Sequence, residues 1–415
     1  MIGQRFSYNP FRWGVIVVPE YLSPGVYIEE FEIGAKPIEG VSTSTAGFVG
    51  FAERGPLNIP TLVTSFARYQ SIFGGYPSRR SGDFRWLAYA VEAFFNNGGQ
   101  RVYVVSAGHA GKIKRQGKNT SDSLTIGRDD PDPLKRTGLC ALKNIREISI
   151  VAIPGLTSQD IQNALITHCE GMKNRFVLFD PIPGQDLTGI QDQRSLYDSK
   201  YAAIYYPWVQ VYDPLSKEPL NVPPSGFICG IYARSDNERG VHKAPANEKL
   251  NGALGLEKIW GKERIITKGH QDILNPKGIN CIRSFPGRGI RVWGARTISS
   301  DKLWKYVNVR RLFIYVEESI RENTQWVVFE PNNEKLWGRL KATITEFLTR
   351  VWMDGALMGK KAEEAFFVKC DRTTMSQSDI DNGRLICVIG IAPTKPAEFV
   401  IFRIAQWQGG SVVTE

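Results

Sequence analysis

The residue types that most often carry out chemistry are scattered along this sequence. Six cysteines stand at positions 140, 169, 229, 281, 370 and 387, and no two of them lie within four residues of each other. This spacing provides neither a CxxC redox motif nor half of a zinc site. The four histidines, at positions 109, 168, 242 and 270, are equally dispersed. His168 and Cys169 are neighbours, but on a helix their side chains would point apart. We therefore expect isolated thiols and no metal site.

Motifs for nucleotide binding and covalent catalysis are also missing. HExxH, GxSxG and GxxxxGK[ST] do not occur, and the glycines of GRGIRVWG (287–294) have the wrong spacing for a dinucleotide fingerprint. One carboxylate, Asp180, follows the apolar run of the strand segment predicted at 175–184 (RFVLFDPIPG). Crevices in α/β sheets form where parallel strands end. An α/β enzyme with its site near Asp180 is therefore the alternative function. A lone Asp beside a Pro-X-Pro turn is more often a turn residue, so we predict no catalytic residue and no cofactor.

Composition and charge narrow the class further. The 415 residues carry a net charge of +10, which alone would suit nucleic acid, a membrane surface or an acidic protein. Residues 101–150 and 257–291 each contribute +5, whereas the first fifty residues sum to −2. No nucleic-acid-binding module accompanies this charge, and no apolar run approaches the ~20 residues that span a bilayer. We expect a protein without a secretory signal that does not bind nucleic acid and does not insert directly into a membrane.

The pattern of apolar residues predicts alternating strands and helices. Strands are expected at 46–56, 102–105, 148–155, 175–184, 289–298 and 325–330, and the alternation of FICGIYARSD (227–236) places it with them. Helices are expected at 86–97, at 160–169 with Ser158 as N-cap, at 304–321 and at 336–351. Residues 106–140 are polar and basic, which is typical of a loop or small excursion. The whole indicates an α/β protein with a largely parallel sheet.

Two predicted strands stand near the chain termini, at 25–31 and 397–407. EFVIFRI has high β propensity, low charge and no proline, as aggregation-prone edge strands do, and GVYIEEF alternates apolar and polar residues. These strands either complete the sheet of their own chain or extend the sheet of a neighbouring subunit.

Long motifs in one order support a family resemblance. PGVYIEE, KPIEGVSTSTAGFVGFAERGP, VTSFARYQSIFGGYP and FFNNGGQRVYVVSAG, followed by GINCIRSFPGRGIRVWGARTIS, YVNVRRLFIYVEESI and FFVKCDRTTMSQSDIDNGRLICVIGIAPTKPAEFVIFRI, make most of residues 20–406 resemble the phage tail sheath family. The sheath subunits of phage-tail-like contractile injection systems are the most similar in character.

The resemblance implies a structural subunit, not an enzyme, that forms hexameric rings stacked around an inner tube. The implied partners are sheath paralogues, the inner tube protein, and baseplate and cap components. The implied fold is an α+β inner domain (46–105 and 281–396) interrupted by an outer α/β domain (106–280). An N-terminal extension with a strand arm (1–45) and a C-terminal strand arm (397–415) complete it. Such a protein would assemble in the bacterial cytoplasm, as part of a phage tail or of a released phage-tail-like particle.

Two groups of residues are the candidate contacts under this resemblance. The inter-subunit strand arms are Gly25, Val26, Tyr27, Ile28, Glu29 and Glu30 at one end, and Glu398, Phe399, Val400, Ile401, Phe402, Arg403 and Ile404 at the other. The candidate tube-facing residues are Lys335, Arg339, Lys341 and Arg350 on the helix predicted at 336–351. Polar contacts of this kind can break on release, but exposed charges are also the norm on any helix.

Overall fold

The computed structural model of the protein describes residues 37–111, 118–258 and 266–401. All of these residues belong to one compact unit that begins at Lys36. The predicted strand at 25–31 and the C-terminal run from residue 402 onward lie outside the described residues.

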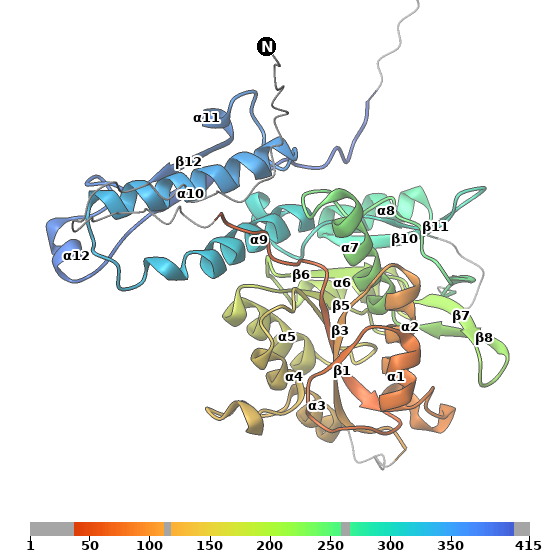
Figure 1. Cartoon of the computed structure of the whole chain (residues 1–415). Coiled ribbons are helices and arrows are strands. Elements are labelled where there is room, and N and C mark those ends of the chain that lie inside the picture. Colours follow the sequence, from red (N-terminus) through yellow and green to blue (C-terminus); the bar gives the residue numbers. More distant parts are fainter. Residues whose placement is uncertain (1–36, 112–117, 259–265, 402–415) are drawn as a thin grey trace, which may run out of the picture. The chain divides into compact units, whose positions relative to one another are not determined.

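The largest sheet has the strand order β11-β10-β6-β5-β4-β1-β3-β2 (Figure 1). Its members are β1 (Ala46–Ala52), β2 (Thr61–Val63), β3 (Val102–His109), β4 (Ile150–Ala152), β5 (Phe176–Phe179), β6 (Ala202–Tyr206), β10 (Ile279–Phe285) and β11 (Gly289–Trp293). The strands from β10 to β3 pair in parallel, whereas β2 and β11 pair antiparallel at the two edges. Every residue of β1 is buried, as expected where helices cover both faces. The predicted α/β class is confirmed.

Helices pack on both faces of this sheet. α2 (Trp86–Asn96) and α7 (Ser225–Arg239) contact each other and one face, and α3 (Lys118–Ile126), α4 (Gly138–Ala141) and α5 (Gln159–Met172) form a second group. The alternation of β1 separates the two groups, because a Cβ on Gly50 would meet Leu87 of α2 at 3.2 Å. A Cβ on Gly47 would instead meet Leu142 and Ile148, which lie on the side of α4.

The remaining helices are α1 (Phe66–Phe73), α6 (Leu187–Ser195), α8 (Lys268–Leu274), α9 (Val307–Asn323), α10 (Glu334–Met353), α11 (Ala362–Ala365) and α12 (Gln377–Asp381). The helices predicted at 86–97, 160–169, 304–321 and 336–351 are thus confirmed as α2, α5, α9 and α10. Ser158 is the N-cap of α5, as predicted, and its hydroxyl accepts a hydrogen bond from the backbone N–H of Ile161.

The grouping of residues 227–236 with the strands is wrong, because they lie inside α7. The apolar alternation conceals a helical spacing of Gly226 and Gly230, which face α2 four residues apart. A Cβ on Gly226 would come within 2.5 Å of the carbonyl oxygen of Ala90, and one on Gly230 within 2.5 Å of that of Phe94. The two glycines therefore let the backbones of α2 and α7 approach closely.

Two other predictions from local sequence need correction. Residues 325–330 are not a strand: a short 3₁₀ helix (Gln325–Val327) follows α9, and Phe329 adopts a positive φ of 70°. Residues 106–140 are not only a loop, because β3 continues to His109, α3 falls within this stretch and α4 begins in it. Asp129 forms ion pairs with Arg136 and Lys143 here, and Leu139 and Ala141 of α4 are buried in the core.

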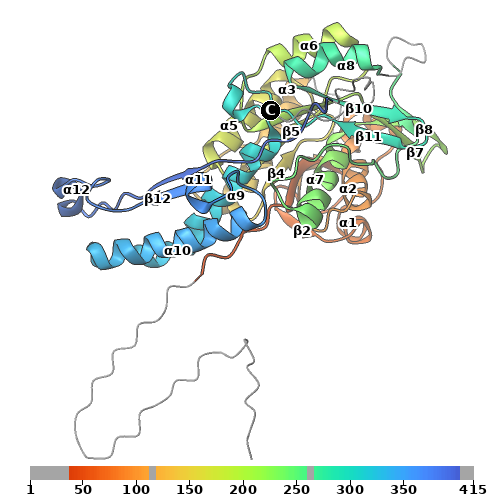
Figure 2. The same cartoon turned by 90° about the horizontal axis from the view of Figure 1, so that it is seen from above.

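A second, smaller core lies around α10 and a two-stranded antiparallel sheet of β12 (Phe366–Lys369) and β13 (Val388–Ile391). α10 runs beside β12 (Figure 2). α9 connects the two cores, because Val307 and Ile314 belong to the first while Leu312 and Val316 belong to the second. A further three-stranded sheet has the order β8 (Glu218–Val222), β7 (Val209–Asp213), β9 (Gly255–Leu256).

The large sheet takes strands from three of the expected segments: 46–105, 106–280 and 281–396. The second core is formed mainly by residues from 312 to 391, together with Ile38 and Val241. The assignment of these segments to an inner and an outer domain concerns an assembly, and it stays a prediction.

Candidate functional site

Asp180, the residue of the enzyme alternative, lies directly after β5 and is buried. Its Oδ1 accepts a hydrogen bond from the backbone N–H of Ser225 (2.8 Å). Its Oδ2 accepts from the backbone N–H of Gly155 (2.9 Å) and the hydroxyl of Ser225 (2.7 Å). Burial raises the pKa of Asp180 to about 6, although these hydrogen bonds favour the carboxylate. Because its own chain engages both oxygens, Asp180 joins the ends of β4 and β5 to the start of α7.

His168 and Cys169 do not form a reactive pair. Nη1 of Arg175 lies 3.1 Å from Nε2 of His168, and this hydrogen bond requires a neutral imidazole whose Nε2 is the acceptor. Burial, together with the charge of Arg175, lowers the pKa of His168 to about 3. Burial raises the pKa of the Cys169 thiol to about 12. Protonated, fully buried thiols of this kind are unreactive.

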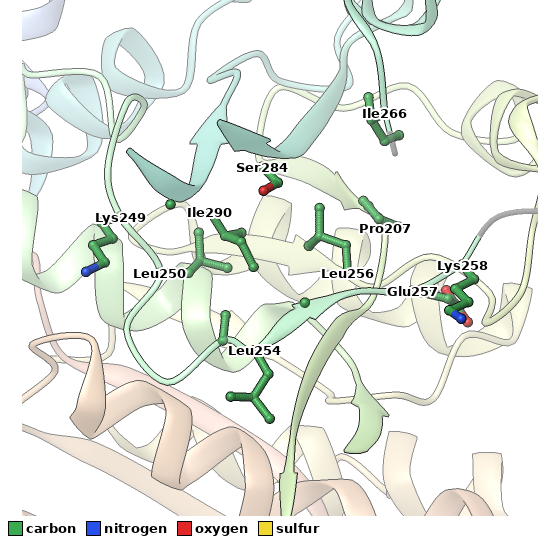
Figure 3. A pocket seen from close by; sticks show the side chains of 13 residues that line it. Pro207, Lys249, Leu250, Leu254, Leu256, Glu257, Lys258, Ile266, Ser284 and Ile290 are labelled. Carbon is green, nitrogen blue, oxygen red and sulfur yellow. The ribbon is translucent and has the colours of Figure 1, made fainter. Parts of the chain in front are cut away.

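A cavity of about 540 Å³ lies beside β9 and β11 (Figure 3). Its walls are mostly apolar, with Leu250, Leu256 and Ile290 among the lining side chains. The carboxylate of Glu257 accepts a hydrogen bond from the backbone N–H of Gly184 (2.9 Å). The other charged or hydroxyl side chains of the lining are Lys249, Lys258 and Ser284, and Figure 3 shows Lys249 and Lys258 on opposite sides of the cavity. Within the described ranges, no three His, Cys, Asp or Glu side chains gather as a metal ion would require.

The four candidate tube-facing residues all lie on α10 and are exposed, but they occupy two sides of it. At 100° per residue, Lys335, Arg339 and Arg350 share one flank of the buried stripe, and Lys341 lies on the opposite flank. The guanidinium of Arg339 stacks on Trp326 (4.4 Å), and that of Arg350 donates to the carbonyl of Ile38 (2.7 Å). The predicted basic face is therefore two separate flanks.

Only the start of the predicted C-terminal arm lies among the described residues. Phe399, Val400 and Ile401 are 70%, 68% and 78% exposed. Glu398 differs, because its carboxylate binds the side chain of Arg296 in its own chain. Residues 25–30 and 402–404 of the two predicted arms lie outside the described residues.

One surface feature was not predicted from the sequence: the β12–β13 pair forms a sheet of its own. Phe366 and Val368 of β12 are buried, whereas the alternate residue Phe367 is 49% exposed. Val388 of β13 is 42% exposed. Among the described strands, β12 and β13 pair only with each other. One isolated bridge joins Leu357 to Pro393, two residues beyond the end of β13. Isolated edges of this kind can accept further strands. The alternation of AFFVK is typical of a strand, but no local sequence pattern indicates that the sheet has only two strands.

These features define a class: an α/β protein whose notable surfaces are strand edges and exposed apolar residues, without a catalytic cluster in the part of the chain that the structure describes. In that same part, no helix combines the length and apolar character that a bilayer crossing requires. Two family models match the chain, the phage tail sheath protein central domain over residues 137–298 and the phage tail sheath C-terminal domain over residues 299–406.

Individual relatives agree with these models. The tail sheath protein of Escherichia phage P2 is 25% identical over 321 residues, which cover 74% of this chain and 77% of the phage protein. A cryo-EM structure of the PVC sheath complex, an extracellular contractile injection system in the contracted state, matches with 30% identity and a TM-score of 0.72. That match covers 94% of this chain and 99% of the PVC chain. The contracted helical sheath of the anti-feeding prophage (AFP) matches with 32% identity and a TM-score of 0.72, over 92% and 99% of the two chains. The chain belongs to the phage tail sheath family.

Proposed function

We propose that this protein is the subunit of a contractile sheath, that it polymerises as stacked hexameric rings around an inner tube, and that contraction of the sheath drives the tube through a target envelope. Similar chains occur in a contracted helical sheath and in a baseplate of the anti-feeding prophage. The proposed partners are further copies of this chain, sheath paralogues, the inner tube protein, and baseplate and cap components. Assembly in the bacterial cytoplasm, with release of the finished particle as one route, accords with these partners.

The β12–β13 sheet is the observation that carries the proposal. Its edges offer main-chain groups to strands from neighbouring copies, and the exposed ring of Phe367 adds apolar area beside them. The chain has two matching donors, residues 25–31 and 399–404, whose sequences favour strands. Main-chain pairing would hold neighbours together through β-augmentation, while weaker contacts between the bodies exchange.

Contacts that add subunits without closing generate a helical polymer, as a sheath requires. In this proposal the extended sheath is held by a kinetic barrier, and contraction releases energy stored at assembly. The inner domain would comprise 46–105 and 281–396, and the outer domain 106–280. No nucleotide or other cofactor takes part, and the role is structural rather than enzymatic.

Truncation of the arms tests this proposal directly. Deletion of residues 399–415 should abolish tubes in negative-stain electron micrographs while the subunit stays folded, because the C-terminal donor is removed. Deletion of residues 1–31 should do the same at the other end. Deletion of residues 1–20 is the matched control, since it keeps the strand at 25–31 and should leave tubes intact. Normal tubes from both long deletions would refute the arm model.

Charge reversal tests the tube contact separately. Lys335, Arg339 and Arg350 share one flank of α10, so we expect their joint replacement by Glu to give sheaths without an inner tube. Lys341→Glu, on the other flank, serves as the control and should leave the tube in place. Equal loss of the tube in both variants would argue against a contact confined to the first flank.

A further inference from the structure

Glu398 holds the start of the C-terminal arm in a charged site of its own chain. Its Oε1 accepts hydrogen bonds from Nδ2 of Asn275 (2.8 Å) and Nε of Arg296 (2.7 Å). Its Oε2 accepts from Nη2 of Arg296 (2.5 Å) and the hydroxyl of Tyr306 (3.2 Å). Nζ of Lys305 lies 3.7 Å from the same oxygen. The two side chains of the central ion pair are only 8% and 19% exposed.

The site that receives Glu398 is fixed to the large sheet. The backbone N–H of Arg296 donates to Oδ1 of Asn280 on β10 (2.7 Å), and Nδ2 of the same asparagine donates to the carbonyl of Arg296 (2.7 Å). Nη1 of Arg296 also donates to the carbonyl of Asn275 (2.8 Å). Asn280 is fully buried and fixes the backbone of Arg296, and the carbonyl of Asn275 gives the guanidinium a partner besides Glu398.

The chain is hydrogen-bonded to its own subunit before Glu398 and exposed after it. On its N-terminal side, the backbone N–H of Thr394 bonds the carbonyl of Ala356 (3.0 Å), and its own carbonyl accepts from Nδ2 of Asn308 (3.3 Å). On its C-terminal side come three consecutive apolar residues, Phe399 to Ile401, each at least 68% exposed. Burial alone would raise the pKa of Glu398, but the hydrogen bonds from Arg296 and Asn275 hold that pKa below its usual range. The carboxylate therefore stays ionised at neutral pH.

We infer that Glu398 is a positioning residue that clamps the root of the C-terminal arm to its own subunit, so that strand exchange with a second copy begins at Phe399. This inference rests on the proposed function and assigns Glu398 a role different from that of the pairing residues after it. A bidentate carboxylate–guanidinium pair fixes direction as well as position. A fixed root limits where the strand can reach, which raises its effective concentration at the acceptor of one particular neighbour.

The experiment uses the full-length chain with Glu398→Gln, Arg296→Gln and the double variant, and Glu238→Gln on the exposed end of α7 as the control. In the unassembled subunit, we measure by mass spectrometry how fast chymotrypsin cleaves after Phe399. Loss of the charge-assisted bonds should speed cleavage about ten- to hundredfold in both single variants, with the melting temperature close to that of the wild type. The double variant should be no faster than the single ones, because both remove the same pair.

Assembly of the same variants is then scored by negative-stain microscopy. We expect the Glu398 and Arg296 variants to form few regular tubes, and the Glu238 variant to form tubes like the wild type. Unchanged cleavage in Glu398→Gln would refute the clamp, and faster cleavage with normal tubes would refute its positioning role. If the wild type itself forms no tubes, the proposed function fails, while the cleavage rates still decide whether the clamp exists.

Discussion

The buried ion pair between Arg311 of α9 and Asp236 of α7 offers a sharp test of what holds the two cores together. Nη1 and Nη2 of Arg311 donate to the two carboxylate oxygens at 2.8 and 2.6 Å, and the side chains are 3% and 2% exposed. Nη2 also donates to the carbonyl of Thr43 (2.9 Å), whose hydroxyl donates to Asp236 (2.6 Å). Burial alone would lower the pKa of Arg311, but the carboxylate of Asp236 raises it overall, so the guanidinium stays charged.

The perturbation is Arg311→Met, which keeps much of the length of the side chain and removes its charge. It leaves the carboxylate of Asp236 buried without its cation, and breaking such a pair costs about 3 to 5 kcal/mol. Since the free energy of unfolding of a domain is typically about 5 to 15 kcal/mol, the loss of this ion pair would remove a large share of the stability. Replacing both partners, as Arg311→Met with Asp236→Leu, removes the stranded charge and should recover most of the loss.

The assay is urea unfolding of the unassembled subunit, followed by circular dichroism. The matched control is Lys268→Met, which breaks the exposed pair with Asp272, whose side chains are 83% and 60% exposed. Exposed pairs contribute about 0 to 1 kcal/mol, so this variant should unfold like the wild type. Two results would refute the reasoning. One is a free energy of unfolding for Arg311→Met within about 1 kcal/mol of that of the control, and the other is a double variant as unstable as Arg311→Met alone.

Three further substitutions test the interior. Asp180→Asn should destabilise the subunit by about 2 to 3 kcal/mol in urea unfolding, because the backbone N–H groups of Gly155 and Ser225 bond different carboxylate oxygens and an amide has only one acceptor oxygen. Stability equal to the wild type would contradict the anchoring role. Gly226→Ala should cost about 1 to 3 kcal/mol in the same assay, because its Cβ would lie 2.5 Å from the carbonyl oxygen of Ala90; a neutral result would mean that α2 and α7 can separate. His168 has a folded-state pKa of about 3, below the ordinary value of 6.5, so its stabilisation is complete above pH 6.5 and is lost as the pH falls toward 3. At pH 5 the loss is about 2 kcal/mol, and His168→Gln should remove that pH dependence from the unfolding curves.

Local pattern was enough to predict the α/β class and the long helices. The stripe from Leu336 to Val351 has helical spacing, and the N-cap Ser158 marks the start of α5, because both signals lie within a few residues. The same reasoning failed for residues 227–236. Their alternation satisfied a strand pattern, and the close packing of Gly226 against Ala90 of α2 depends on a tertiary contact that no local pattern contains.

The candidate contacts could be predicted only in part for the same reason. Strand propensity at the C-terminus is a local property, so Phe399 to Ile401 could be picked out as residues that favour a strand. The partner of Glu398, by contrast, lies 102 residues away in the sequence. No spacing rule connects Arg296 to Glu398, and the two-stranded nature of the β12–β13 sheet is equally a result of tertiary folding.

Under the proposed function, contacts inside the subunit and contacts between subunits have different tasks. A subunit that moves as a body during contraction needs an interior whose polar groups are paired, and the Arg311–Asp236 pair and the Asp180 anchor supply this at the junctions between elements. Links between subunits must persist while the bodies rotate, and main-chain pairing at an edge such as β12 tolerates that motion because it depends little on side chains. Glu398 lies between the part of the chain with contacts inside the subunit and the part that would link subunits. It ties an exposed, strand-forming segment to a rigid sheet, so the motion of each body would be transmitted through its arm to the neighbour.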